Sequence, residues 1–174
     1  ELTPDGNIII AAETQKGPND RDVYVITVAQ DLSLLNSTQV GLKTIAGLES
    51  DEEVNSISII QSGYIVAGAT TAVETDNASN LKDALHIRLN NSLVPLDPEA
   101  GRWNNTSGFN DSDDVLIKMV EVHAKTYYGF GYTDKIRNNS RDYKYWVFEL
   151  GEFGEAGDDD QDLLDIGSTV EDEI

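Results

Sequence analysis

Strings of β-branched and aromatic residues return at a constant interval along this chain. The strand-like segments 23–28, 84–89 and 145–150 start 61 residues apart at each step. In all three, apolar residues hold every second position, as in a strand with one face better buried than the other. This recurrence limits the possible folds, because each copy must cover its apolar side with the next one.

Two further anchors recur in the same way. Segments 6–14, 63–70 and 125–133 each pass from β-branched or aromatic residues through small residues to a threonine, which is typical of a strand. An acidic segment, 47–54, returns 61 residues later at 108–115, and segment 167–174 follows after another 59 residues. The chain is therefore predicted to be a single region, 1–174, with three copies of one unit at 1–54, 55–115 and 116–174.

Two more strands complete the predicted unit. A first strand follows the acidic segment, at 56–60 and 116–122, and a weaker fourth strand lies at 34–42 and 93–103. The second copy of this fourth strand contains two prolines, which cannot donate to a strand ladder, so it belongs at a sheet edge.

Four strands per unit predict an all-β, β-propeller-like fold with about three consecutive four-stranded antiparallel blades. The small residues Ala11, Ala12, Ala67, Gly68, Gly129 and Gly131 fall at one repeat position, where blades converge on an axis. Close packing in a β-sandwich is the alternative explanation for them. Propellers have about four to eight blades, so the three copies are expected to be part of a larger propeller. Either they belong to a longer chain, or two chains close a ring of about six blades by exchanging terminal strands.

The charge excludes several classes of ligand. The chain carries 32 acidic and 12 basic residues, a formal net charge of −20. Such a surface repels nucleic acid and anionic lipid headgroups, and attracts cations or a basic partner. No apolar run is long enough for direct membrane insertion. Cysteine is absent, which removes disulfides, thiolate metal sites and a cysteine nucleophile.

The second copy resembles a repeat of secreted and surface-anchored bacterial β-propellers. The matching residues are Asn55-Ser56-Ile57, then Gly63-Tyr64-Ile65-Val66-Ala67-Gly68-Ala69-Thr70, and then an apolar strand after Asp83. The third copy departs most, since Lys125-Thr126 replaces the turn glycine. The resemblance implies an extracellular or outer-membrane-surface protein, often a lipoprotein, and implies no particular activity.

Few residues are candidates for a site. Asp158, Asp160 and Asp162 have the alternate spacing that opens many Ca²⁺ loops, but Leu163 stands where such a loop needs glycine. A hydrated acidic loop is the alternative, and no other cofactor is indicated. Arg102, Trp103, Asn104 and Asn105 combine the usual anchors of a binding surface with amides, unless the tryptophan packs between blades.

No catalytic set stands out. His86 and His123 lie in different copies, and His86 replaces a valine of its sister copies. No Gly-x-Ser-x-Gly occurs, so a serine-based triad has no support. The acidic segments are expected to be structural or solvated turns. One basic patch surrounds segment 138–139, with Lys135, Arg137, Arg141 and Lys144.

The function expected from the sequence is a non-enzymatic binding or scaffold module on the bacterial cell surface or secreted. Its expected ligand is a protein partner or a polysaccharide, and it can be part of a larger complex. The alternatives are a carbohydrate-active propeller enzyme, either a hydrolase or a lyase, and a structural subunit of an outer-membrane surface assembly.

Overall fold

The computed structural model describes residues 1–18, 20–42, 50–71, 82–96, 113–137 and 140–150. All the regular secondary structure in these ranges is β-strand, and every strand pair is antiparallel. The all-β, antiparallel character predicted from the sequence is confirmed. The described part contains no helix long and apolar enough to cross a lipid bilayer.

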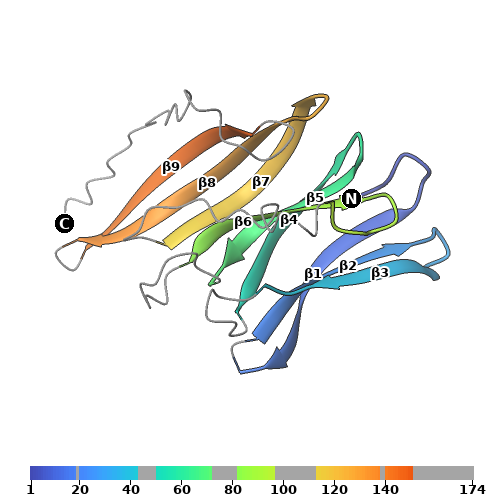
Figure 1. The fold of residues 1–174 in the computed structure, drawn as a ribbon, viewed down its shortest axis with the longest axis horizontal. Coiled ribbons are helices and arrows are strands. Elements are labelled where there is room, and N and C mark those ends of the chain that lie inside the picture. Colours follow the sequence, from blue (N-terminus) through green and yellow to red (C-terminus); the bar gives the residue numbers. More distant parts are fainter. Residues whose placement is uncertain (19, 43–49, 72–81, 97–112, 138–139, 151–174) are drawn as a thin grey trace.

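The strands form three sheets of three strands each, in chain order (Figure 1). The first sheet contains β1 (Ile8–Gly17), β2 (Asp20–Val28) and β3 (Leu34–Val40), the second β4 (Glu52–Ile60), β5 (Gly63–Thr70) and β6 (Asp83–Asn90), and the third β7 (Asp113–His123), β8 (Thr126–Arg137) and β9 (Ser140–Leu150). The second sheet lies between the other two, so the chain builds a row of sheets.

Each sheet contains three of the four strand types predicted for the unit. The first sheet has the second, third and fourth types, and β3 lies at its edge, as expected for the fourth type. The second and third sheets have the first three types. Beyond β6, the chain makes one bridge back to it, between Leu89 and Pro95, and Leu96 N donates to Arg88 O at 3.0 Å.

The turn after the third strand type recurs in detail. Leu32 and Leu93, 61 residues apart, both have a positive φ, of 67° and 59°. Each N–H donates 2.9 Å back to a carbonyl three residues earlier, that of Ala29 or Asn90. A non-glycine residue with positive φ is uncommon. Its occurrence at equivalent positions supports the repeat independently of the hydrophobic pattern.

The sequence suggested that small residues recur because blades converge on an axis. The strand register gives a different reason. Ala12, Gly68 and Gly131 are paired with Tyr24, Leu85 and Trp146, the large residues of the neighbouring strand. A Cβ on Gly131 would lie 2.4 Å from Trp146 Cζ2, and a Cβ on Gly68 would lie 1.7 Å from the Glu53 carbonyl oxygen on the opposite side. Contacts within the second and third sheets therefore require a glycine at positions 68 and 131.

The strand pairing shifts the alignment of the two acidic segments, 47–54 and 108–115, by one residue. Glu52 pairs with Thr70 and Asp114 pairs with Thr133, so the first strands repeat after 62 residues instead of 61. Glu52 and Asp114 are also inside strands and almost fully buried, with 0% and 1% of their surface exposed. The expectation of solvated turns is wrong at these two positions.

Two hydrophobic clusters fill the spaces between sheets. The cluster between the first and second sheets includes Ile9, Val23, Val25, Val66, Leu85, Ile87 and Leu89. The cluster between the second and third sheets includes Ile65, Ala67, Ala84, Leu116, Met119, Tyr127 and Trp146. The second sheet is thus buried on both faces, which explains why β5 has no exposed residue along its whole length.

We expect Leu85→Ala to lower the free energy of unfolding by about 3 kcal/mol, because it leaves a cavity in the space between the first two sheets. The matched control is Leu34→Ala, since Leu34 is 61% exposed at the edge of the first sheet. Urea denaturation of both variants measures the difference. A similar loss for both would contradict the assignment of Leu85 to the core.

Candidate functional site

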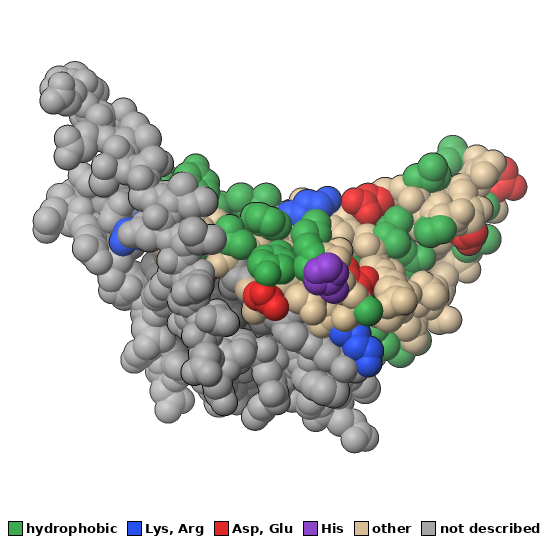
Figure 2. Space-filling model, turned by 90° about the horizontal axis from the view of Figure 1, so that it is seen from above, with side chains coloured by type: hydrophobic (Ala, Val, Ile, Leu, Met, Phe, Trp, Pro, Cys, Tyr) green, Lys and Arg blue, Asp and Glu red, His purple; other side chains and the backbone are tan. Residues whose placement is uncertain are grey.

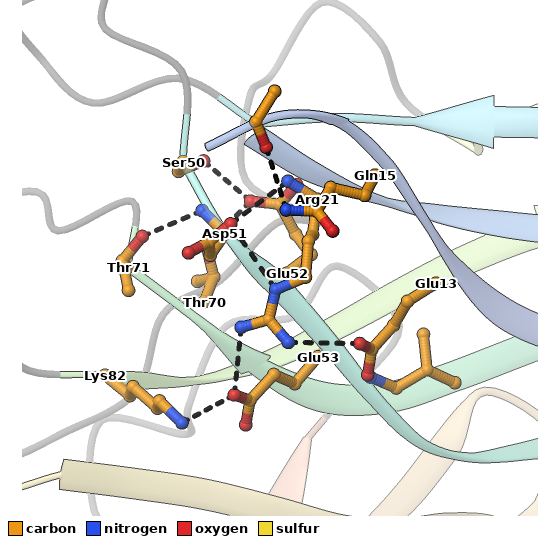
Figure 3. Close-up of polar contacts among 12 residues, drawn as sticks. Glu13, Gln15, Arg21, Ser50, Asp51, Glu52, Glu53, Thr70, Thr71 and Lys82 are labelled. Atoms are coloured by element: carbon orange, nitrogen blue, oxygen red, sulfur yellow. Dashed lines mark hydrogen bonds and ion pairs between the residues drawn. The ribbon is translucent and has the colours of Figure 1, made fainter. Parts of the chain in front are cut away.

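The densest polar cluster in the described part of the chain joins the first two sheets (Figure 3). Arg21, in β2, lies at its centre. Glu13 comes from β1, Asp51 directly precedes β4, Glu53 lies in β4, and Lys82 directly precedes β6. These strand ends meet at one end of the sheets, where the hairpin of β1 and β2 faces the start of β4.

The guanidinium of Arg21 contacts three carboxylates from two sheets. Nη1 donates to Glu13 Oε2 and Nη2 to Glu53 Oε1, both at 3.1 Å, and Nε lies 3.4 Å from Asp51 Oδ1. Lys82 Nζ donates to the same Glu53 oxygen at 2.6 Å. The other oxygen of Glu13 accepts the backbone N–H of Val54 at 3.0 Å. The planar guanidinium, with its several donors, suits such a three-way contact.

The charges in this cluster stabilise one another. Burial alone would lower the pKa of Arg21, but the hydrogen bond that it donates to Glu53 and the charges of Asp51 and Glu13 raise it above its usual value. Burial likewise opposes ionisation of Glu53, and the contacts with Lys82 and Arg21 outweigh it, so the pKa of Glu53 is lowered. Arg21 and Glu53 are therefore both charged at neutral pH.

A backbone contact within this cluster recurs between the second and third sheets. Asp51 Oδ1 accepts the N–H of Arg21 at 3.1 Å, and Asp113 Oδ1 accepts the N–H of Lys82 at 2.8 Å. Each time, an aspartate at the start of one sheet holds the start of the third strand type in the sheet before it. A signal for this contact was present in the sequence, since Arg21 and Lys82 are basic residues 61 apart, but the alignment of the acidic segments did not include them.

Glu52 is a buried carboxyl group whose hydrogen-bond partners in the described part of the chain are all uncharged. Its Oε1 lies 2.6 Å from Ser50 Oγ and accepts a hydrogen bond from Thr70 Oγ1 at 3.0 Å, and Leu42 N approaches Oε2 at 3.4 Å. Burial raises the pKa of Glu52 to about 7, and the nearby charge of Asp22 adds to the rise, while the hydrogen bonds oppose it.

Ser50 is consistent with a protonated Glu52. Its hydroxyl lies within hydrogen-bonding distance of both Glu52 Oε1 and the Leu42 carbonyl oxygen, at 2.6 and 2.9 Å. A serine has one proton to donate. When Glu52 is protonated, it can donate to Ser50, which then donates to Leu42, and all three groups are satisfied.

This geometry suits the joining of sheets better than chemistry on a ligand. The carboxylates of Glu13, Asp51 and Glu53 are engaged by cations, and Glu52 is enclosed. In the described ranges, no group of three or more acidic, histidine or cysteine side chains is arranged to hold a metal ion.

The two histidines lie in different sheets. His86 is in β6, almost fully buried, and burial followed by the charge of Arg88 lowers its pKa to about 4. It is thus a neutral strand residue at pH 7, in agreement with the expectation that it replaces a core valine. His123 is exposed at the end of β7.

The binding and metal candidates from the sequence lie outside the described residues. This applies to Arg102, Trp103, Asn104 and Asn105, and to the proposed Ca²⁺ ligands Asp158, Asp160 and Asp162. They stay predictions. The residues predicted to form a basic patch belong to β8 and β9, where the backbone of Lys135 is paired with Asp142 and that of Thr133 with Lys144.

Comparisons of the chain with protein-family models, with curated proteins and with solved structures found no match.

Glu52→Gln tests the buried carboxyl. The pKa of Glu52 in the folded protein is about 7, above its usual 4.5. Its contribution to the free energy of unfolding is therefore fully present below pH 4.5, where the group is protonated, and is lost as the pH rises through 7. At pH 8 the variant should be more stable than the wild type by about 2 kcal/mol, and the gain should disappear near pH 5. Urea midpoints from pH 5 to 8 measure it.

The control for this experiment is Asp31→Asn, which removes an exposed carboxyl. Hydrogen bonds from Ser33 lower the pKa of Asp31, so it stays ionised throughout this pH range. Its stability difference from the wild type should not change between pH 5 and 8. If Glu52→Gln behaves like Asp31→Asn, Glu52 titrates normally and the burial argument fails.

Arg21→Met should destabilise the protein by about 1–2 kcal/mol, because three partly buried carboxylates lose their shared partner. Lys118→Met is the control, since Lys118 makes one exposed ion pair, with Glu1 at 3.3 Å, and its loss should cost under about 0.5 kcal/mol. Urea denaturation at low salt and in added salt measures both. Equal effects of the two substitutions would mean that the cluster does not hold the sheets together.

Proposed function

We propose that this chain is a non-enzymatic, β-propeller-like binding and scaffold module that binds a protein partner at the end where the polar cluster lies. Its sheets correspond to four-stranded blades of a larger propeller. In this view, the row of sheets is the rigid support, and the chain segments joining strands at that end form the ligand-binding surface.

The distribution of connections carries this proposal. Connections 41–51 and 71–82 both begin and finish at the end with the polar cluster. At the other end, strands are joined through the short connections 61–62 and 124–125. The longest connection, 91–112, starts at the other end beside Gly63 and finishes at Asp113. All three long connections therefore reach the end where Asp51 and Asp113 fix the positions of neighbouring sheets, although the short connections 18–19 and 138–139 lie at that end as well.

The state of the charged groups supports binding over catalysis. A carbohydrate-active enzyme would need accessible carboxyl groups with separate roles as acid and base or nucleophile. Glu52 has the raised pKa that suits an acid, but none of its surface is exposed. The other carboxylates of the cluster are held by Arg21 and Lys82.

The net charge of the chain indicates the charge of the protein partner. At −20, the chain attracts a basic protein over distances limited by salt screening. A neutral polysaccharide is the other candidate, and its binding should depend little on salt. The resemblance of the second copy to secreted and surface-anchored bacterial repeats supports a location outside the bacterial cell, where such partners occur.

Replacing residues 72–81 with a short glycine–serine linker tests the proposal, because this keeps β5 and β6 and removes one long connection. The tagged wild type should retain a basic protein from an extract of its native source at low salt and release it at high salt. The linker variant should retain about tenfold less, the loss expected for roughly 1.4 kcal/mol of binding.

The control variant is Leu32→Ser, an exposed change at the opposite end, which should bind like the wild type. Affinity electrophoresis in gels containing neutral polysaccharides gives the other possible outcome. Retardation there without protein capture would replace the protein partner with a polysaccharide. Turnover of a polysaccharide would overturn the non-enzymatic function.

A further inference from the structure

The two internal interfaces of the molecule are built in the same way. We call the face of each sheet that is turned toward the preceding sheet its N-side face, and the opposite one its C-side face. Val66 and Leu85 on the N-side face of the second sheet pack against the first sheet, and Ala67 and Ala84 on its C-side face pack against the third. Each interface therefore joins a C-side face to an N-side face.

The C-side face of the third sheet is apolar and exposed. Phe130 precedes Gly131 as Ala67 precedes Gly68, so the two hold equivalent positions. Ala67 is fully buried, whereas Phe130 is 43% exposed. Tyr145 is 57% exposed, while Ala84, 61 residues earlier, is 1% exposed. Side chains alternate along a strand, so Tyr128 and Tyr132 lie on the same face as Phe130.

This face is also preorganised. The rings of Tyr132 and Tyr143 meet edge to face, with centroids 6.1 Å apart. The hydroxyl of Tyr128 donates to Glu149 Oε2 at 2.6 Å. Large aromatic groups held on a sheet lose little conformational entropy when they are covered, which favours their use in an interface.

The N-side face of the first sheet is also apolar and partly exposed, and it is the type of face that a C-side face contacts inside the molecule. Ile10 lies two residues before Ala12, and Val66 lies two residues before Gly68, so the two hold equivalent positions. The side chain of Ile10 is 42% exposed, whereas that of Val66 is fully buried. Tyr24 is half-buried, whereas Leu85 at the equivalent position is fully buried. Ile8 and Ile26 belong to the same face by strand alternation.

The two exposed faces belong to sheets on opposite sides of the molecule, so one cannot cover the other within one copy (Figure 1). Seen from above, the described part of the molecule shows a group of hydrophobic side chains with acidic, basic and histidine side chains beside them (Figure 2). Exposed apolar patches of this kind mark interaction surfaces.

We propose that the C-side face of the third sheet binds the N-side face of the first sheet of a second copy, as consecutive sheets bind within one copy. The contact is heterologous, joining unlike surfaces, and repeats into a closed ring or an open row. This inference rests on the proposed scaffold role and names a second copy as one of its partners. Since both copies are strongly negative, salt should strengthen their association, the opposite of its effect on a basic partner.

Sedimentation velocity of the purified chain tests this inference, from about 1 to 100 µM, the range in which moderate affinities are visible. The wild type should form larger species as concentration and salt rise. Phe130→Glu and Ile10→Glu should each stay monomeric, or associate at least about tenfold more weakly, because each places a charge on one of the two faces. Val94→Glu is the control, as Val94 is 53% exposed on a turn outside both faces.

Mixing the two variants separates this contact from others. Phe130→Glu keeps an intact N-side face and Ile10→Glu keeps an intact C-side face, so an equimolar mixture should form a dimer with one copy of each. Circular dichroism confirms that each variant is folded, and Phe130→Ser and Ile10→Ser replace any variant that is not.

A wild type that stays monomeric throughout the concentration range would overturn the inference. So would a Phe130→Glu or Ile10→Glu variant that associates as strongly as the wild type, since this would indicate pairing of like faces or a different surface. If Val94→Glu weakened self-association as much as the two face variants, the inference would also be overturned. Capture of a basic protein at low salt is measured separately, so failure of self-association leaves the proposed function standing.

Discussion

Apolar sheets that must cover one another are the constraint on which this structure depends. Each sheet is too thin to form a core alone, so stability comes from the spaces between sheets. The second sheet satisfies this on both faces, and β5, with Ile65 on one side and Val66 on the other, is buried throughout. The first and third sheets satisfy it on one face only, which leaves Ile10 and Phe130 exposed.

Apolar packing is not directional, so polar contacts are needed to fix how one sheet sits on the next. Asp51 and Asp113 do this at the same end of successive sheets by accepting backbone N–H groups of the sheet before. At the first interface, Arg21 adds contacts to carboxylates from both sheets. The row of sheets is thus held by apolar contacts along its faces and aligned by charged groups at one end.

The sequence was sufficient for three recurring strand types and their order, because the 61-residue spacing of Val25, His86 and Val147 reports the same position in three sheets. It also predicted a fourth strand at 93–103, of which the described residues contain one bridge, between Leu89 and Pro95. It was not sufficient for the acidic segments. Counted between equivalent residues, the chain between the third strand type and the next first strand is one residue longer after β6 than after β2, which changes the spacing from 61 to 62 there. Only hydrogen-bonded pairing reveals the equivalence of Glu52 and Asp114.

The candidate site shows the same limit. Contacts such as that of Arg21 with Glu53 join residues 32 positions apart on different sheets, and neither local composition nor periodicity encodes which charge meets which. The raised pKa of Glu52 was also beyond sequence reasoning, because it depends on complete enclosure by residues from β5 and the chain before β4. Charge counts predicted an acidic surface, and part of that acidity is inside.

The recurring turn at Leu32 and Leu93 has a consequence for how the repeat can change over time. A left-handed backbone at a leucine is tolerated only where the surrounding hydrogen bonds hold it, so this corner leaves little freedom for insertion or deletion. Variation in length is then directed to the opposite end, where connections differ between copies already. One end of the row keeps the same turn geometry in two copies, and the other is where connections differ in length.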